Sequence, residues 1–237
     1  MVAGELRREG WQVNAKRVYR LWRREGLKVA RRARKHRAKG GSANSCINRP
    51  ARHKDDIWAM DFIHDSTAQG GSLKMLVIED EFTRECLALE VGGSRFSGER
   101  VSEVLAELFV IRGAPRGLRS DNGKEFTGRA TRRMLRAGGV EPLAVEAGCP
   151  WENGVVESLN SILRDELLNT ELFGTVQAAR HMATAWRLEY NHRRPHGALG
   201  YLAPAEYATR CQAAPGSAAL RPTRPGSGTR DNAMVLS

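Results

Sequence analysis

The chain has 237 residues, of which 41% are hydrophobic and 27% are charged, and its formal net charge is +11. A chain of this length can bury a full core in one or two domains, and no apolar run approaches the roughly 18 residues of a membrane span. The polar first residues lack the apolar stretch of a secretory signal, and the cysteines are scattered without zinc-ligand spacing. These features exclude a membrane protein and a structural zinc site, and they favour a cytoplasmic location.

The positive charge is concentrated at the start of the chain. Residues 1–54 hold 17 Lys/Arg and 3 Asp/Glu, a balance of +14, whereas residues 55–237 hold 21 and 24, a balance of −3. A basic segment attracts nucleic-acid phosphates through the release of counterions, and a solvated disordered tail is the alternative. We expect a basic, DNA-binding arm at 1–40 and a linker at 41–54.

One helix is expected within this arm, at about 14–26. Asn14 can cap its start, Gly26 can close its end, and Val18, Leu21 and Trp22 form an apolar stripe. Basic residues cover its other faces and are the candidate DNA contacts of the arm: Lys16, Arg17, Arg20, Arg23 and Arg24.

The rest of the chain up to about residue 208 alternates between strand and helix patterns. The expected elements, in chain order, are strands at 57–63, 74–78 and 86–91, a helix at 98–112, a strand at 117–120, a helix at 128–137, a strand at 140–145, and helices at 154–169 and 175–190. Three strands followed by alternating helices and strands indicate a mixed α/β domain, in which an antiparallel meander leads into parallel strands. The composition of residues 209–237, rich in Ala, Pro, Gly and Arg, predicts a disordered tail.

Three carboxylates have positions that suit metal binding. Asp61 lies inside an apolar strand, Asp121 follows a strand, and Glu157 lies on the polar face of a helix with Asn160 and Arg164. Hard oxygen ligands suit Mg²⁺ or Mn²⁺, and two such ions about 3.5–4 Å apart can activate an attacking oxygen and stabilise a leaving oxygen at phosphorus. Any one of these residues taken alone would more often be structural, so the argument depends on their spacing, with 59 and 35 residues between successive carboxylates.

The sequences around the carboxylates carry a family resemblance. Residues 58–62 read Trp-Ala-Met-Asp-Phe, residues 119–126 read Arg-Ser-Asp-Asn-Gly-Lys-Glu-Phe, and residues 152–160 read Glu-Asn-Gly-Val-Val-Glu-Ser-Leu-Asn. This set resembles the integrase catalytic core of the DDE recombinases, which include retroviral integrases and many bacterial transposases. Residues 164–169 and 186–200 narrow the resemblance to OrfB, the second-frame product of bacterial insertion sequences, over about residues 5–207.

The resemblance implies a ribonuclease-H-like fold at 55–208, with a mixed five-stranded sheet flanked by helices. It implies that Asp61, Asp121 and Glu157 bind two Mg²⁺ ions, for which Mn²⁺ can substitute, and that the chain cleaves DNA at the ends of an insertion sequence and transfers the strands. The implied partners are the terminal inverted repeats, the target DNA, a first-frame OrfA protein and further copies of the chain on DNA. The implied location is the bacterial nucleoid.

Two departures from the family pattern favour an alternative. Family members usually carry several dozen more residues before this start, and Cys149 and Glu152 replace a cation and an amide in the loop before the catalytic helix. Both loop changes weaken the attraction of phosphate. The alternative is a truncated, catalytically inactive DNA-binding fragment that modulates a full-length transposase. A third hypothesis, a ribonuclease H, conflicts with the 35-residue gap and with the motifs at 164–169 and 186–200.

Several polar residues have two open interpretations. Asn122 either shapes the turn that aims Asp121 or contacts DNA. Asn160 and Arg164 either contact DNA or support the carboxylates, with a solvated helix face as the alternative. Residues 191–197 form either a phosphate-binding segment or a structural corner.

Overall fold

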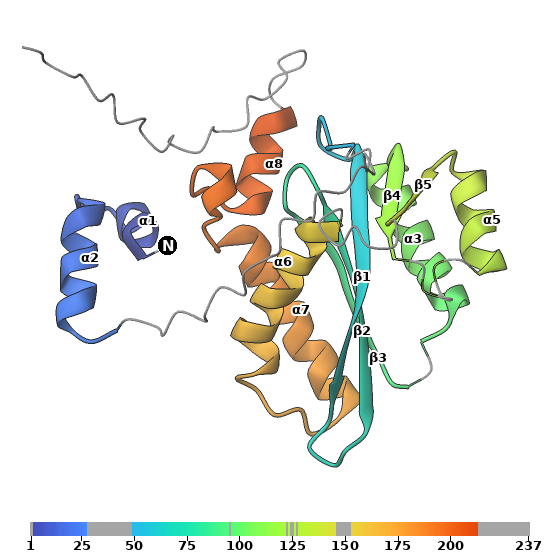
Figure 1. Cartoon of the computed structure of the whole chain (residues 1–237), viewed down its shortest axis with the longest axis horizontal. Coiled ribbons are helices and arrows are strands. Elements are labelled where there is room, and N and C mark those ends of the chain that lie inside the picture. Colours follow the sequence, from blue (N-terminus) through green and yellow to red (C-terminus); the bar gives the residue numbers. More distant parts are fainter. Residues whose placement is uncertain are drawn as a thin grey trace, which may run out of the picture.

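The centre of the fold is a five-stranded mixed sheet with strand order β3-β2-β1-β4-β5 (Figure 1). The computed structural model describes residues 2–27, 49–94, 96–121, 123, 126, 128–145 and 153–212. The strands are β1 (Ile57–Ser66), β2 (Ser72–Asp80), β3 (Cys86–Gly92), β4 (Gly117–Ser120) and β5 (Glu141–Ala144). The first three strands pair antiparallel, and β1, β4 and β5 pair parallel. This arrangement confirms the expected meander leading into parallel strands.

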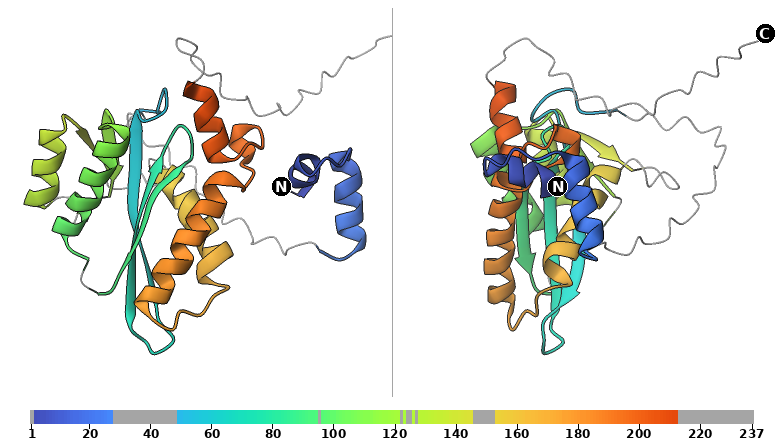
Figure 2. Two further views of the ribbon diagram at one scale, coloured as in Figure 1. Left: turned by 180° about the vertical axis from the view of Figure 1, so that it is seen from behind. Right: turned by 90° about the vertical axis from the view of Figure 1, so that its left-hand side faces the viewer.

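Helices cover both faces of the sheet (Figures 1 and 2). One face packs against α3 (Gly98–Arg112) and α5 (Arg129–Ala137), and the other packs against α6 (Gly154–Leu163) and α7 (Val176–His192). Because side chains alternate along a strand, Trp58 and Met60 of β1 face the α3 side, while Ala59 and Ile63 face the α6 side. Asp61 therefore belongs to the α6 side. In the described ranges, no helix is long and apolar enough to span a membrane.

The boundaries expected from the sequence agree best with those of the structure where a glycine or proline ends a helix or strand. The helix at 98–112 and the strand at 117–120 match α3 and β4 at both ends. By contrast, β1 continues to Ser66, because its pairing with β2 extends to Ser72 through polar residues beyond the core. The helix expected at 154–169 is divided into α6 and a short π-helical segment, Arg164–Leu168.

The buried stripe of α6 differs from the expected one. The apolar spacing along 154–169 predicts that Val155 faces the core with Leu159 and Leu163, but Val156 is fully buried together with these two leucines, and Val155 is half-buried. The one-residue difference rotates the helix by about 100°. Glu157 remains exposed and Asn160 is half-buried, so the polar side of α6 still lies beside the core stripe.

The N-terminal segment forms two helices, α1 (Val2–Arg8) and α2 (Ala15–Arg24), of which only α2 was expected. The Asn14 side chain caps α2 by accepting from the Lys16 N–H at 2.8 Å. Arg8 anchors α1 to the body through Glu206 and the Arg193 carbonyl, both at 2.7 Å. No residue of α2 is buried, and this helix stands off the sheet domain (Figure 2). The basic run at 28–40 and most of the expected linker lie outside the described residues.

The sheet domain begins earlier than the expected boundary at 55. Ala51 is buried in a cluster that includes Ile57 and Phe82, and Arg49 forms an ion pair with Glu141 at 2.7 Å. Residues 49–54 therefore pack on the body instead of belonging to a linker. At the other end, α8 (Pro204–Gln212) continues past the expected start of the tail at 209, and residues 213–237 lie outside the described ranges.

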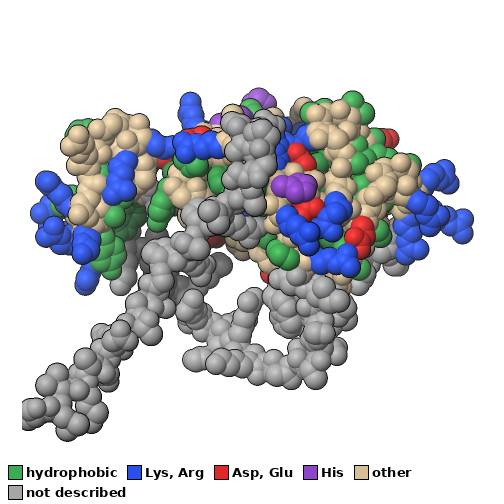
Figure 3. Space-filling model, turned by 90° about the horizontal axis from the view of Figure 1, so that it is seen from above, with side chains coloured by type: hydrophobic (Ala, Val, Ile, Leu, Met, Phe, Trp, Pro, Cys, Tyr) green, Lys and Arg blue, Asp and Glu red, His purple; other side chains and the backbone are tan. Residues whose placement is uncertain are grey.

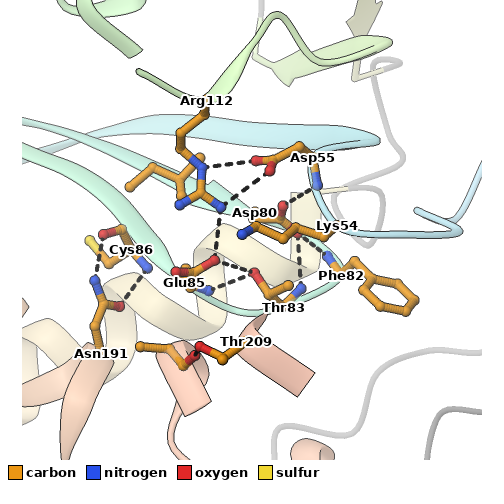
Figure 4. Close-up of polar contacts among 12 residues, drawn as sticks. Lys54, Asp55, Asp80, Phe82, Thr83, Glu85, Cys86, Arg112, Asn191 and Thr209 are labelled. Atoms are coloured by element: carbon orange, nitrogen blue, oxygen red, sulfur yellow. Dashed lines mark hydrogen bonds and ion pairs between the residues drawn. The ribbon is translucent and has the colours of Figure 1, made fainter. Parts of the chain in front are cut away.

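Polar contacts fix the turn between β2 and β3 (Figure 4). The buried carboxylate of Asp80 accepts from the backbone N–H groups of Asp55, Phe82 and Thr83. Arg112 of α3 binds both Asp55 and Glu85. On the other face, the Asn191 side chain of α7 pairs with both backbone groups of Cys86, each at 2.9 Å. The turn is thereby attached to helices on both faces of the sheet.

Candidate active site

The register of two parallel strands brings Asp61 and Asp121 together. Ala59 of β1 pairs with Arg119 of β4, and each carboxylate residue follows two positions later along its chain. Neighbouring strands lie about 4.8 Å apart, so the two residues emerge next to each other at this edge. Asp61 is half-buried and Asp121 is exposed.

Helix α6 brings a third carboxylate to the same place. The Asn160 side-chain amide donates to Asp61 Oδ2 at 2.7 Å, which fixes this part of the helix against β1. Glu157 lies three residues before Asn160, and residues three apart share one side of a helix. The same contact that holds Asp61 therefore places Glu157 near it.

The electrostatics of Asp61 show that the three carboxylates sense one another. Burial raises the pKa of Asp61, and the negative charges of Asp121 and Glu157 raise it further. Hydrogen bonds from the Phe62 N–H at 2.8 Å and from Asn160 act in the opposite direction. Like charges gathered at one point repel each other, and a bound cation relieves that repulsion.

The donor set fits a hard divalent cation, although the side chains do not close around one point. Among the described residues, no three carboxylate, imidazole or thiolate groups are positioned to hold one metal ion together. Asp121 Oδ1 instead accepts from the Gly123 N–H at 2.9 Å. The side chains of Asp121 and Glu157 are both exposed. Asp61, held by two hydrogen bonds, is the fixed member of the three.

An aromatic contact connects the segments that carry the two aspartates. Phe62, next to Asp61, stacks on Phe126, which follows Asp121 in the chain, with ring centroids 4.9 Å apart and an interplanar angle of 9°. Lys74 Nζ lies 4.1 Å from the centroid of the Phe62 ring. This stack was not expected from the sequence, although each aspartate has an aromatic residue nearby in the chain.

The other candidate residues fall into three groups: one contacts β1, some lie outside the described residues, and the basic ones lie on α2. Arg164 donates to the His64 carbonyl at 3.4 Å and so connects the end of α6 to β1. Asn122 and the loop at 146–152, which includes Cys149 and Glu152, lie outside the described residues. The candidate cations of α2 are all exposed, on a helix that stands off the sheet domain (Figure 2): Lys16, Arg17, Arg20, Arg23 and Arg24.

The segment at 191–197 has the contacts of a structural corner. Arg194 forms an ion pair with Glu166 at 2.7 Å and lies over the Tyr190 ring. Burial, followed by the charges of Arg84 and Arg194, lowers the pKa of His196 to about 4, so its ring is neutral at neutral pH. A neutral, half-buried imidazole offers no charge to a phosphate.

Comparisons with known proteins identify the family. Two models described as integrase core domain match residues 51–150 and 138–204. The chain is 38% identical over 216 residues to the insertion element IS407 uncharacterized 31.7 kDa protein of Burkholderia multivorans, covering 88% of this chain and 74% of that protein. It is 30% identical over 203 residues to the putative transposase InsD for insertion element IS2E of Escherichia coli, covering 82% of this chain and 91% of that protein.

The fold has a solved counterpart in a chain of the simian T-cell lymphotropic virus intasome in complex with a PP2A regulatory subunit. The TM-score is 0.56 at 15% identity, over 77% of this chain and 63% of that chain. This similarity shows the shared ribonuclease-H-like architecture, and the sequence matches show the family. The chain belongs to the insertion-sequence transposases that carry an integrase core domain.

Proposed function

We propose that this chain cleaves DNA at the ends of its insertion sequence and joins those ends to target DNA, with Asp61, Asp121 and Glu157 as metal ligands. The observation that supports the proposal is the β1–β4 register, which brings Asp61 beside Asp121, together with the Asn160–Asp61 bond that holds α6, and Glu157 on it, nearby. When bound there, two Mg²⁺ ions, or Mn²⁺ in their place, activate an attacking oxygen and stabilise a leaving oxygen at phosphorus.

The proposed reaction has two steps. A water oxygen attacks the phosphodiester at the element end, the bond from phosphorus to the 3′ oxygen breaks, and that oxygen leaves as a 3′-hydroxyl. The 3′-hydroxyl then attacks a phosphodiester of the target DNA, and a second 3′ oxygen leaves. Neither step requires a serine or tyrosine nucleophile of the chain.

The side chains have different tasks in this scheme. Asp61 keeps a constant position because the Phe62 N–H and the Asn160 amide hold its two oxygens. Asp121 and Glu157 are exposed and turn towards Asp61 as the site closes. Asn160 is a positioning residue, since it fixes both the Asp61 carboxylate and the approach of α6.

The proposed partners are DNA and other transposition proteins. The exposed cations of α2 provide a phosphate-binding surface outside the active site. The inverted repeats of the element and the target DNA are the substrates, a first-frame OrfA protein helps to recognise the ends, and several copies of the chain assemble on DNA. The protein acts at the bacterial nucleoid.

A strand-transfer assay with the ends of the element tests the proposal. Asp121→Asn keeps the shape of the side chain but removes the charge that holds a cation, so cleavage and joining should stop while DNA binding continues. Asp65→Asn is the matched control, because Asp65 also lies on β1 but, among the described residues, its side chain accepts only from the Ser66 N–H. If Asp121→Asn retains most of the Mg²⁺-dependent activity of the parent chain, the assignment is incorrect.

A second candidate function is an inactive DNA-binding protein that modulates an active transposase. The observation in its favour is that the described carboxylates do not close around one metal position. On this hypothesis the parent chain binds the element ends but shows no metal-dependent cleavage, and it lowers the activity of a complete transposase in a mixed reaction. Measurable cleavage that is lost in Asp121→Asn excludes this alternative.

A further inference from the structure

A cavity of about 450 Å³ lies beside Asp121, between β4, β5 and α5. Its size falls in the range of about 300–1,000 Å³ that is usual for small-molecule sites. Most of its wall is apolar, and its polar groups are Ser120, Asp121 and two arginines. The lining residues are Leu118, Ser120, Asp121, Phe126, Arg132, Leu135, Arg136, Val140, Pro142 and Ala144.

The wall of the cavity has the chemistry of a nucleobase site. Phe126 is 4% exposed, and its stacking on Phe62 fixes its orientation. Every nucleobase has a planar face that can stack on aromatic and aliphatic side chains, so such stacking does not depend on the identity of the base. Sites for unstacked bases also carry polar groups that form hydrogen bonds with the edge of the base. The Ser120 hydroxyl is such a group here, beside the proposed metal ligand Asp121.

The rim of the cavity has the chemistry of a phosphate site. Helix α5 buries Thr131 and Leu135 and exposes four arginines at helical spacing: Arg129, Arg132, Arg133 and Arg136. None of the four forms an ion pair within the part of the chain that the structure describes. Figure 3 shows Lys and Arg side chains gathered at the edge of the molecule where α5 lies in Figure 1. Only Arg132 and Arg136 line the cavity.

We propose that this cavity receives an unstacked nucleobase from the DNA strand that reacts beside Asp121, while Arg132 and Arg136 bind the phosphate next to that base. The proposal rests on the proposed function, because that function brings the reactive phosphate to Asp121. The base loses its stacking contacts in the duplex and gains contacts in the cavity. These new contacts hold the strand end in place. The purpose of the site is to position the reactive phosphate, without reading the base sequence.

Fluorescence of 2-aminopurine tests the proposal, because this base emits more strongly when it is unstacked. Short duplexes from the element end carry one 2-aminopurine at each position near the cleavage point in turn and are mixed with the full chain in Ca²⁺ buffer. We expect emission to rise on binding at one position. Ala144→Phe, which fills the cavity from an exposed position on β5, should remove the rise while the chain still binds the duplex.

The arginines provide a matched pair of double variants. Arg132→Ala with Arg136→Ala should remove the emission rise and lower the slope of log affinity against log salt by roughly 0.9, because the two arginines bind one phosphate and each phosphate contact contributes about that much. Arg129→Ala with Arg133→Ala removes the same charge from the same helix but leaves the cavity unchanged, so the rise should persist. The proposal is overturned if bound DNA shows no rise at any position, or if Ala144→Phe leaves the rise intact.

This experiment distinguishes the base site from the proposed chemistry. Glu157 does not line the cavity, so Glu157→Gln should abolish strand transfer and preserve the emission rise. An emission rise without strand transfer in the parent chain supports the base site and counts against the proposed function. Strand transfer without an emission rise supports the proposed function and counts against the base site.

Discussion

The stability of the protein should depend on pH through one buried glutamate. Glu79 is 1% exposed near the end of β2, and its Oε2 has no hydrogen-bond partner among the described residues. Burial, together with the negative charges of Asp80 and Glu81, raises the pKa of Glu79 to about 8, and Arg84 offsets only part of this effect. We therefore expect Glu79 to be protonated in the folded protein at neutral pH.

The sign and size of the effect follow from the two pKa values. The folded state holds this proton more tightly than the unfolded state, so the free energy of unfolding falls as pH rises from about 4.5 to about 8. A difference of about 3.5 pKa units corresponds to roughly 5 kcal/mol, since each unit is worth about 1.4 kcal/mol. Glu79→Gln keeps the volume and removes the titration, so the variant should lose most of this decline.

Urea denaturation of both proteins in a pH series measures the difference. The window between pH 6 and pH 8 is the most informative, because Asp80, whose pKa burial raises to about 6, adds its own decline below that range in both proteins. Glu90→Gln, on the surface of β3 and paired with Arg100, is the control and should behave like the parent chain. The reasoning is refuted if Glu79→Gln loses stability between pH 6 and pH 8 as steeply as the parent.

Three further predictions concern the packing of the domain and the basic arm. Asn191→Ala leaves the backbone N–H and C=O of Cys86 unpaired, so urea denaturation should show a loss of at least about 1–3 kcal/mol. A chain that begins at Asp55 should melt at a lower temperature than one that begins at Arg49, because it lacks the Ala51 contacts and the Arg49–Glu141 pair; equal melting temperatures would show that residues 49–54 add nothing. The chain that begins at Arg49 should keep the fold but bind duplex DNA more weakly, with a salt slope that falls by about 0.9 per lost phosphate contact; an unchanged slope in fluorescence anisotropy would show that the arm does not contact DNA.

The local sequence pattern was sufficient to predict most helices and strands of the sheet domain. The apolar spacing of α3 and the residues Gly113 and Pro115 after it mark an element that needs no distant information. The spacing of Asp61, Asp121 and Glu157, together with the neighbouring motifs, selected three residues, and the register of β1 and β4 brings the two aspartates side by side. These features could be predicted because each depends on residues close in sequence or on a repeated family pattern.

The features that were missed depend on contacts between distant parts of the chain. No residue of α1 is buried, and Arg8 holds the helix through Glu206, 198 positions away. Ala51 is buried by residues of β1, the β2–β3 turn and the C-terminal region, which its own polar neighbourhood does not reveal. The cavity beside Asp121 likewise forms only when β4, β5 and α5 meet. For α6, the local pattern favoured Val155 on the core side, but packing on the sheet buries Val156 instead.

A substitution that changes which metal ion position 121 prefers is the most direct test of Asp121 as a metal ligand. Asp121→Cys exchanges a hard oxygen for a softer sulfur, which Mn²⁺ accepts more readily than Mg²⁺ does. The variant and the parent chain are compared in strand transfer of the element ends with each ion. We expect the variant to be inactive with Mg²⁺ and to recover activity with Mn²⁺, while the parent chain is active with both ions. A variant that is as active as the parent with Mg²⁺ would contradict the assignment of Asp121 as a metal ligand.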